Sequence, residues 1–202
     1  MAKFSTILLF GAPGVGKGTQ GKTLHQLPGF YHLASGDVFR ALKDDSLEGR
    51  QAASFSSRGE LVPDELTIHI FLSYLDELIS SNAFSPESDL LLLDGIPRNV
   101  PQAEILAERF DVRKVISFRY NDEELMVARM KKRAEMENRA DDADDEVIRN
   151  RFRVYRNESE PVLDFYSDEI VSEIDCTASP VEVLRSVLDC IIPLQKQLAC
   201  GT

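Results

Sequence analysis

Short apolar runs alternate along this chain with longer segments in which apolar residues recur at helical spacing. Five of the apolar runs predict strands, at Thr6–Phe10, Phe30–Leu33, Leu90–Leu93, Val115–Phe118 and Ile170–Ile174. Strands that are apolar nearly throughout are typical of a sheet covered on both faces. The amphipathic segments predict helices at Pro63–Ile79, Asp122–Glu137, Asp145–Phe165 and Pro180–Leu198. This alternation predicts an α/β fold in which a five-stranded parallel sheet carries helical crossovers on both faces.

Two polar stretches interrupt this pattern. Ala41–Gly59 is rich in serine and has no clear strand, and Glu135–Asp145 is rich in charged residues. We expect both stretches to be excursions from the core. No internal repeat or low-complexity linker divides the chain, so residues 1–202 are expected to form a single domain.

The composition limits the classes of partner. The chain has 202 residues, with 34 Asp and Glu against 23 Lys and Arg, and a formal net charge of −11. Apolar residues make up 43%, which is enough for a real core. The acidic balance argues against binding to nucleic acid or to an anionic membrane, because both would repel the chain. The net charge does not exclude binding of small anionic substrates, because a few Arg and Lys side chains can make the local electrostatic field positive.

The cysteine pattern and the short apolar runs favour a protein of the reducing cytosol. Cys176, Cys190 and Cys200 show no Cys-x-x-Cys spacing, so we expect neither a disulfide framework nor structural zinc. No apolar run approaches the roughly 18 residues that a membrane helix needs, and no signal-peptide pattern stands near the N-terminus. We expect a soluble, cytoplasmic protein that acts as a monomer.

A glycine-rich loop follows the first predicted strand and leads into a helical stretch. It reads Gly11-Ala12-Pro13-Gly14-Val15-Gly16-Lys17-Gly18-Thr19. Glycines let the backbone turn so that its N–H groups face phosphate oxygens, and the following helix adds the positive end of its dipole. Lys17 would supply a point charge, while Thr19 carries the hydroxyl one residue later than the strict pattern has it. The loop predicts binding of a nucleoside triphosphate with Mg²⁺.

The loop alone leaves two classes open, a phosphotransferase and a nucleotide-dependent switch or binding module. A phosphotransferase must also hold a second substrate in line, so it needs a second set of anion-binding residues. Such a set is present. Ser35–Arg40 follows the second predicted strand, Asp94–Arg98 follows the third, and Gln102 comes four residues later.

Four segments together, Gly11–Gln20, Ser35–Arg40, Arg58–Asp64 and Asp94–Gln102, resemble the nucleoside monophosphate kinases and most of all the adenylate kinases. The resemblance implies a P-loop three-layer fold and reversible, Mg²⁺-dependent phosphoryl transfer from ATP to AMP, giving two ADP. ATP and AMP bring about six negative charges together, and cations must offset their repulsion. Two alternatives stay open, a UMP-CMP kinase and a non-catalytic P-loop module.

The resemblance also implies roles for individual residues. ATP would be bound by Gly14, Val15, Gly16, Lys17, Gly18, Thr19, Arg129 and Arg133. AMP would be bound by Ser35, Arg40, Glu60, Leu61, Val62, Gly95, Arg98, Gln102, Arg139 and Arg151. The catalytic residues would be Lys17, Arg98, Arg133, Arg139 and Arg151. Asp94 would hold Mg²⁺ through water, with Thr19 as a second candidate.

Gln102 favours AMP over the pyrimidine nucleotides. Adenylate kinases place a Gln here that reads the adenine edge, whereas UMP-CMP kinases place an Asn. Gln and adenine can form a paired donor–acceptor contact. Ser35 keeps a hydroxyl where adenylate kinases usually have Thr and UMP-CMP kinases have Ala. Glu60 stands where adenylate kinases often have Lys, so Glu60 and Val62 are expected to contact AMP through their backbone.

Basic residues recur in the second half of the chain. Arg129 and Arg133 are four positions apart and share a helix face. The plain alternative is an exposed basic patch that balances Glu123 and Glu124. The resemblance instead places Arg129 beside the ATP adenine and Arg133 at the transferring phosphates.

Arg139 and Arg151 would complete the cationic set. Their spacing is one residue longer than the family pattern, so Arg149 is the fallback for Arg151. The acidic run Asp141–Glu146 is expected to be a solvated helix start, or else Asp141 and Asp142 orient arginines when the lid closes.

The resemblance implies two small subdomains, an NMP-binding insertion at residues 34–62 and a short lid at 131–142. It also places backbone contacts to the ATP adenine after the last strand, in the segment Asp175–Ser179. His25, His32 and His69 match no metal or triad spacing and are expected to be surface or packing residues.

Overall fold

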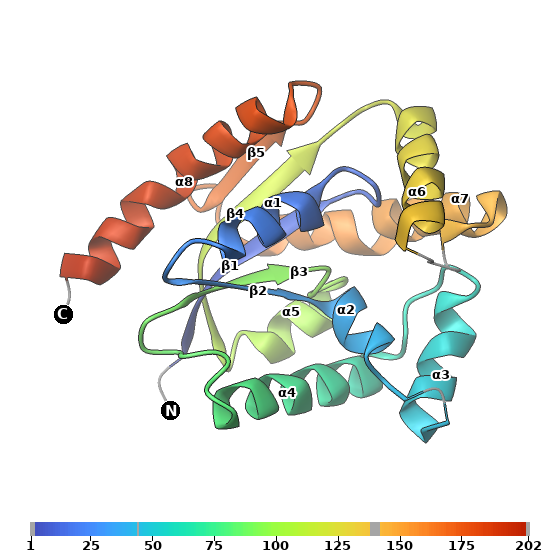
Figure 1. Cartoon of the computed structure of the whole chain (residues 1–202), viewed down its shortest axis with the longest axis horizontal. Coiled ribbons are helices and arrows are strands. Elements are labelled where there is room, and N and C mark those ends of the chain that lie inside the picture. Colours follow the sequence, from blue (N-terminus) through green and yellow to red (C-terminus); the bar gives the residue numbers. More distant parts are fainter. Residues whose placement is uncertain (1–2, 44, 138–141, 201–202) are drawn as a thin grey trace.

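The computed structural model describes residues 3–43, 45–137 and 142–200. It contains a sheet of five parallel strands in the order β2-β3-β1-β4-β5. The strands are β1 (Phe4–Gly11), β2 (Phe30–Ala34), β3 (Leu90–Asp94), β4 (Phe110–Arg119) and β5 (Val171–Asp175). Helices lie on both faces of the sheet (Figure 1), so the predicted α/β fold is confirmed.

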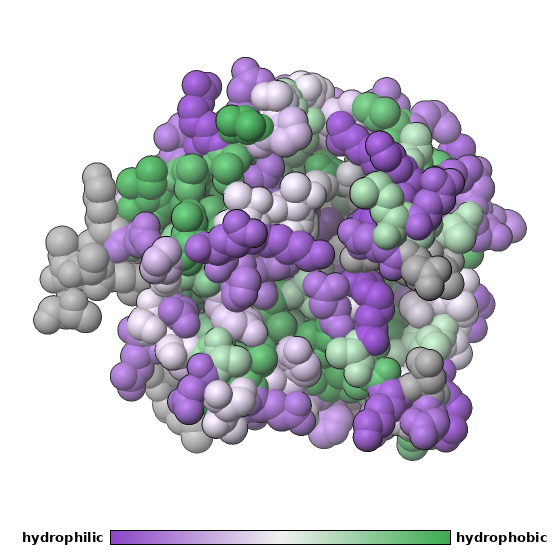
Figure 2. All heavy atoms as spheres, in the orientation of Figure 1, coloured by the Kyte–Doolittle hydropathy of each residue, from purple (hydrophilic) through white to green (hydrophobic). Residues whose placement is uncertain are grey.

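The helices connect successive strands and flank the sheet. They are α1 (Lys17–His25), α2 (Ser35–Arg40), α3 (Leu47–Ser56), α4 (Asp64–Ser80), α5 (Val100–Leu106), α6 (Glu123–Glu137), α7 (Asp145–Val154) and α8 (Pro180–Cys200). Within the described residues, no helix combines the length and the apolar character that crossing a membrane requires. Figure 2 shows hydrophilic residues over much of one face, with hydrophobic residues gathered where Figure 1 places α8.

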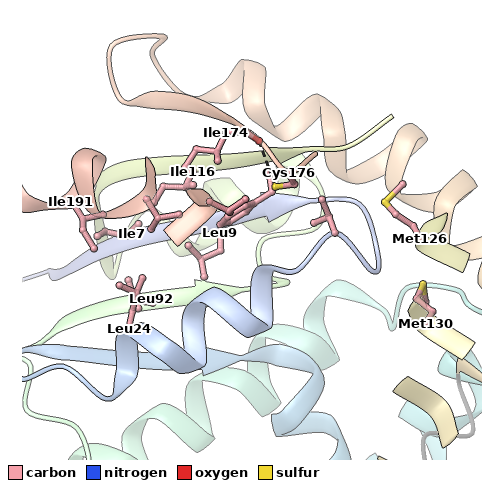
Figure 3. Close-up of a cluster of buried hydrophobic side chains, with 14 of the residues drawn as sticks. Ile7, Leu9, Leu24, Leu92, Ile116, Met126, Met130, Ile174, Cys176 and Ile191 are labelled. Atoms are coloured by element: carbon pink, nitrogen blue, oxygen red, sulfur yellow. Dashed lines mark hydrogen bonds between the residues drawn. The ribbon is translucent and has the colours of Figure 1, made fainter. Parts of the chain in front are cut away.

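Alternate residues of the central strands enter two different cores. Ile7 and Leu9 of β1 pack with residues of α1, α6, α7 and α8, whereas Leu8 and Phe10 pack with residues of α2, α4 and α5. Figure 3 shows the first core, in which Leu24 of α1 and Ile191 of α8 approach the sheet. Burial on both faces explains why these strands are apolar at nearly every position.

Two of the predicted boundaries were wrong. The helix predicted over Asp145–Phe165 is α-helical only to Val154, and continues as a π-helical turn (Tyr155–Ser159) and a 3₁₀ segment (Glu160–Phe165). Pro161 has no N–H and its ring obstructs the preceding turn, so the α-helical hydrogen-bond pattern changes there. Strand β4 begins at Phe110, well before the predicted Val115. The prediction missed its first half because Asp111, Arg113 and Lys114 interrupt the apolar run, and only Phe110 is buried among residues 110–114.

The polar stretch Ala41–Gly59 contains a helix that its composition concealed. Helix α3 begins after Ser46, whose hydroxyl accepts a hydrogen bond of 2.9 Å from the Gly49 N–H. A serine at this position satisfies a backbone donor that the first helical turn leaves free. Figure 1 shows α3 lying apart from the sheet, so this stretch is an excursion from the core, as predicted.

The buried strand interior predicts a large loss of stability on truncation. Leu92 in β3 has no exposed surface, so Leu92→Ala should lower the free energy of unfolding by about 2–5 kcal/mol through lost burial and the cavity left behind. Leu47→Ala is the control, because Leu47 is 61% exposed and should change stability by less than about 0.5 kcal/mol. Urea denaturation of the two variants measures both values, and equal midpoints would contradict the packing described.

Candidate active site

A cleft of about 830 Å³ lies where the carboxyl ends of the central strands meet. The strand register aligns Leu9 of β1 and Ala34 of β2 with Asp94 of β3, so β2 and β3 end at one level and β1 ends two residues further on, at Gly11. Parallel sheets of this kind bind ligands outside the carboxyl ends of their strands. The segments that follow β1, β2 and β3 contain the three predicted anion-binding motifs.

The glycine-rich loop packs tightly against the protein on one side and is open on the other. Gly11 and Gly14 have positive φ, and a Cβ on them would lie 2.7 Å from the Phe118 carbonyl oxygen and 2.9 Å from the Met126 carbonyl oxygen. Gly16 also has positive φ, but a Cβ there would meet no atom within 4 Å. Gly16 is the N-cap of α1 and has no side chain to cap the first N–H groups. An anion at this helix end would take their place as acceptor.

Lys17 is held inside the loop by main-chain oxygens. Its Nζ donates to the carbonyl oxygens of Gly11 at 2.7 Å and Ala12 at 3.2 Å. Burial lowers the pKa of Lys17 to about 8. Asp94 opposes that shift, while the guanidiniums of Arg98, Arg151 and Arg133 add to it. A positive charge that is destabilised in this way is stabilised again by a bound polyanion.

Asp94 lies opposite the loop and stays ionised. Burial pushes its pKa up, but the neighbouring His32 and Lys17 outweigh burial and hold the pKa below its usual value. The His32 Nε2 lies 3.7 Å from the Asp94 Oδ2, a separation at which the influence is electrostatic. A Cβ at Gly18 would lie 3.5 Å from the same Oδ2, so the glycine keeps the space beside the carboxylate clear.

This corner fits Mg²⁺ held together with a nucleotide. The ionised carboxylate of Asp94 and the hydroxyl of Thr19 both line the cleft, and Mg²⁺ prefers oxygen ligands. Across the described residues, no group of three or more His, Cys, Asp and Glu is placed to hold a metal. Mg²⁺ commonly keeps its waters and takes one carboxylate plus substrate phosphates, which is the set that this corner offers.

A second group of residues surrounds Arg98, beyond β3. The Arg98 Nε donates to the Gly95 carbonyl oxygen at 2.8 Å, and its Nη2 lies 3.4 Å from the Ser35 hydroxyl. Ser35 in turn donates to the Gly95 oxygen at 2.6 Å, where Gly95 has φ +75°. Arg40 lines the same part of the cleft and pairs with Asp37 at 2.5 Å. Arg40 and Arg98 thus both line the cleft, and each has a contact that fixes its side chain.

Gln102, which the resemblance assigns to the adenine edge, is held by protein partners in this structure. It is only 1% exposed and is absent from the cleft lining. Its Oε1 accepts from the Arg98 N–H at 2.8 Å, and its Nε2 donates to the Asp64 Oδ1 at 2.7 Å. Asn99 caps helix α5 by accepting from the Gln102 N–H. In this arrangement the amide supports the Arg98 backbone.

Asp142 joins the two late arginines. It has no exposed surface, accepts from the Arg133 Nε at 2.8 Å, and pairs with Arg151 through its other oxygen. Both arginines line the cleft. Arg149 projects elsewhere and pairs with Glu124 and Asp145. The structure therefore brings Arg151, and not Arg149, to the cleft, and its Asp142 contact matches the arginine-orienting alternative.

Comparison with known proteins agrees with this geometry. Residues 9–171 match the family model described as adenylate kinase. The chain belongs to the adenylate kinase family. It is 40% identical over 183 residues to the adenylate kinase of Rhodococcus erythropolis, with 88% of this chain and 93% of the relative covered. It is 38% identical over 169 residues to that of Bacteroides thetaiotaomicron, covering 81% and 85%.

Membership of the adenylate kinase family confirms the function predicted from the motifs. The chain is a transferase of the nucleoside monophosphate kinase type, with adenylate kinase activity. Another adenylate kinase, from Flavobacterium johnsoniae, is 37% identical over 194 residues and covers 91% of this chain and 97% of the relative. The similarity thus extends over the P-loop, the Arg98 region and the late arginines alike.

Most of the residues that the adenylate kinase resemblance selected meet in the cleft. They are Gly14, Val15, Gly16, Lys17, Gly18, Thr19, Ser35, Arg40, Leu61, Asp94, Gly95, Arg98, Arg129, Arg133 and Arg151. Glu60, Val62 and Gln102 are outside this lining. Arg139 lies outside the described residues, as does Asp141.

The cleft also contains residues that sequence reasoning missed. Lys22 and Lys132 add cations, and Val183 adds apolar surface. Residues of these types are common on surfaces and in cores, so no local pattern marks them. Cys176 and Ala178 also line the cleft, and they belong to Asp175–Ser179, the segment named from the sequence for contacts to the ATP adenine. Arg129 lies over the Tyr120 ring at 4.9 Å, which orients its guanidinium.

The lowered pKa of Lys17 predicts a pH dependence of ATP binding. Lys17 is mostly charged below its pKa of about 8 and loses its proton as the pH rises through that value. Because the polyanion favours the charged form, the Kd for ATP should rise about tenfold between pH 7 and pH 9. Titration calorimetry of the nucleotide-free protein measures this change. Lys17→Met should bind weakly throughout and lack the step, and a pH-independent Kd in the unaltered protein would contradict the assignment.

Proposed function

We propose that this chain catalyses ATP + AMP ⇌ 2 ADP in the cleft beyond β1, β2 and β3. The observation that carries the proposal is the convergence of Lys17, Arg98, Arg133 and Arg151. The three guanidiniums are close enough to lower the pKa of the lysine. Such a concentration of like charge is unfavourable alone, and a pair of phosphorylated nucleotides offsets it.

The ATP phosphates would lie in the glycine-rich loop against Lys17 and the N-terminus of α1. The AMP phosphate would lie between Arg40 and Arg98. Arg133 and Arg151, with Arg139, would contact the phosphoryl group in transfer. An AMP phosphate oxygen forms the new bond to the γ-phosphorus as the bond to the β–γ bridging oxygen breaks. No general base is required, because this oxygen is already anionic, and catalysis is positioning and charge stabilisation.

Mg²⁺ would be held through water by Asp94, with Thr19 as a second candidate, and when bound it neutralises charge on the phosphate oxygens. The protein's part is to keep Asp94 ionised beside the loop, which the neighbouring His32 and Lys17 favour. The clear space at Gly18 lets the ion and its waters approach the carboxylate.

AMP would be enclosed by the NMP-binding insertion at 34–62. The Glu60 side chain pairs with Arg58 at 2.7 Å, so Glu60 and Val62 would contact the nucleotide through their backbone. The Glu60 N–H already donates to Phe55 and the Val62 carbonyl oxygen already accepts from Thr67, so the Glu60 carbonyl oxygen and the Val62 N–H would make these contacts. Gln102 would read adenine by exchanging its hydrogen bond to Asp64 for one to the base. The short lid at 131–142 would close over the phosphates and exclude water, so that the phosphoryl group reaches AMP instead.

The choice of acceptor tests the function directly. With Mg²⁺-ATP as donor, a coupled assay should show AMP strongly preferred when AMP, UMP, CMP and GMP are offered in turn. The reason is that the Gln102 amide and the Ser35 hydroxyl match adenine better than a pyrimidine. Preference for UMP or CMP would overturn the AMP assignment, and ATP binding without transfer to any acceptor would overturn the catalytic one.

The proposed contact between Arg98 and the AMP phosphate predicts how far catalysis should fall when the guanidinium is removed. Arg98→Ala should lower kcat/KM for AMP about a hundredfold, by analogy with the loss of other charge-stabilising donors. Arg113→Ala is the control, because Arg113 is an exposed arginine on β4 outside the cleft lining. Steady-state kinetics of both variants make the comparison, and near-normal turnover in Arg98→Ala would refute the role of Arg98 in binding the AMP phosphate.

A further inference from the structure

Asn150 connects helix α7 to the loop that follows α3. Its Nδ2 donates a hydrogen bond of 2.6 Å to the carbonyl oxygen of Arg58, 92 positions earlier in the chain. Its Oδ1 accepts from the Arg153 Nη2 at 2.7 Å. A guanidinium only donates and a carbonyl only accepts, so these two partners determine which end of the amide faces which. Asn150 is therefore oriented toward the loop by its own helix.

Gly59, the next residue in the loop, rests directly on α7. It is buried and has φ +69°, and a Cβ there would lie 2.7 Å from the Val147 carbonyl oxygen and 2.9 Å from the Arg151 Cγ. Both the backbone conformation and the close approach therefore require glycine. Figure 1 shows the chain leaving α3 and running toward α6 and α7. The loop thus contacts α7 at two adjacent points.

Different contacts determine the shape of this loop and its position in the molecule. The N–H groups of Arg58 and Glu60 donate to the Phe55 carbonyl oxygen, and the Gly59 N–H donates to Ser56, all within the loop and the end of α3. These local bonds define the turn wherever it lies. The contacts to α7 place the turn relative to the rest of the cleft.

The same turn of α7 also presents a cation to the cleft. Arg151 follows Asn150 in sequence, lines the cleft and pairs with the buried Asp142. Gly59 and Leu61 line the cleft from the loop side. One helical turn therefore holds the loop with Asn150 and a phosphate-side guanidinium with Arg151.

We propose that Asn150 is a positioning residue for AMP. It anchors residues 57–62 on α7, so that Gly59 and Leu61 face the nucleotide while Arg151 faces the phosphates. This inference rests on the proposed function, which assigns the loop to AMP. The glycine-rich loop and Lys17 are built on β1 and α1, so loss of the anchor should affect AMP and leave ATP binding nearly unchanged.

Asn150→Asp tests the anchor with minimal change in shape. It keeps an oxygen for Arg153 and replaces the donor with an oxygen that faces the Arg58 carbonyl. The KM for AMP should rise about five- to tenfold, the effect of one lost hydrogen bond, while kcat and the KM for ATP change less than about twofold. Asn150→Gln restores a donor and should return the KM for AMP toward its original value. Arg153→Ala should give a smaller rise.

Asn157→Asp is the matched control. Asn157 is exposed on the π-helical turn that follows α7, and the same change of amide to carboxylate there should alter neither KM. Equal rises in both KM values for Asn150→Asp, or a fall in kcat with the KM for AMP unchanged, would overturn the positioning role.

Amide hydrogen exchange of the nucleotide-free protein tests the anchor without catalysis. Residues 57–62 should exchange faster in Asn150→Asp than in the unaltered protein or in Asn157→Asp, with similar urea midpoints in all three. Unchanged exchange would reject the anchor even in an active enzyme. Faster exchange in a protein that does not phosphorylate AMP would support the anchor and reject the proposed function instead.

Discussion

The gathering of positive charge around a buried lysine, in a protein of net charge −11, is the constraint on which the site depends. Burial and three guanidiniums all act to remove the proton from Lys17, and the carboxylate of Asp94 opposes them. Repulsion of this kind would separate mobile side chains. The cations stay together because the fold supplies each of them with a fixed partner.

The nature of those partners decides how much charge remains for a ligand. Lys17 is held by the carbonyl oxygens of Gly11 and Ala12, and the Nε of Arg98 by that of Gly95. A carbonyl fixes a cation without cancelling its charge. Asp142, by contrast, is a full carboxylate, but it is shared between two arginines. The cleft is thereby preorganised for polyanions before any nucleotide arrives.

Local patterns allowed much of this to be predicted. The strand before the glycine-rich loop, the helix after it and the parallel sheet depend on near neighbours and on burial of both sheet faces, which the sequence shows as apolar runs. The change of helix type before Pro161, the early start of β4 and the helix capped by Ser46 were missed or misplaced. Pro161 and Ser46 each act at a single position without altering the apolar periodicity, whereas the first half of β4 was missed because it is not apolar throughout. The amide of Gln102 lies inside for a related reason, since Asp64 and the Arg98 N–H come to it only when distant segments fold together.

The sequence by itself determined the α/β class, the family and the list of residue types that contact phosphate, because each depends on short motifs and on hydrophobic spacing. Tertiary structure alone decided that Arg151 and not Arg149 enters the cleft, that Asp142 is shared by two arginines, and that Asn150 meets the backbone of Arg58. Neighbouring positions on a helix point in different directions, and only the packing of α7 against α6 and the loop after α3 selects which of them faces the nucleotides.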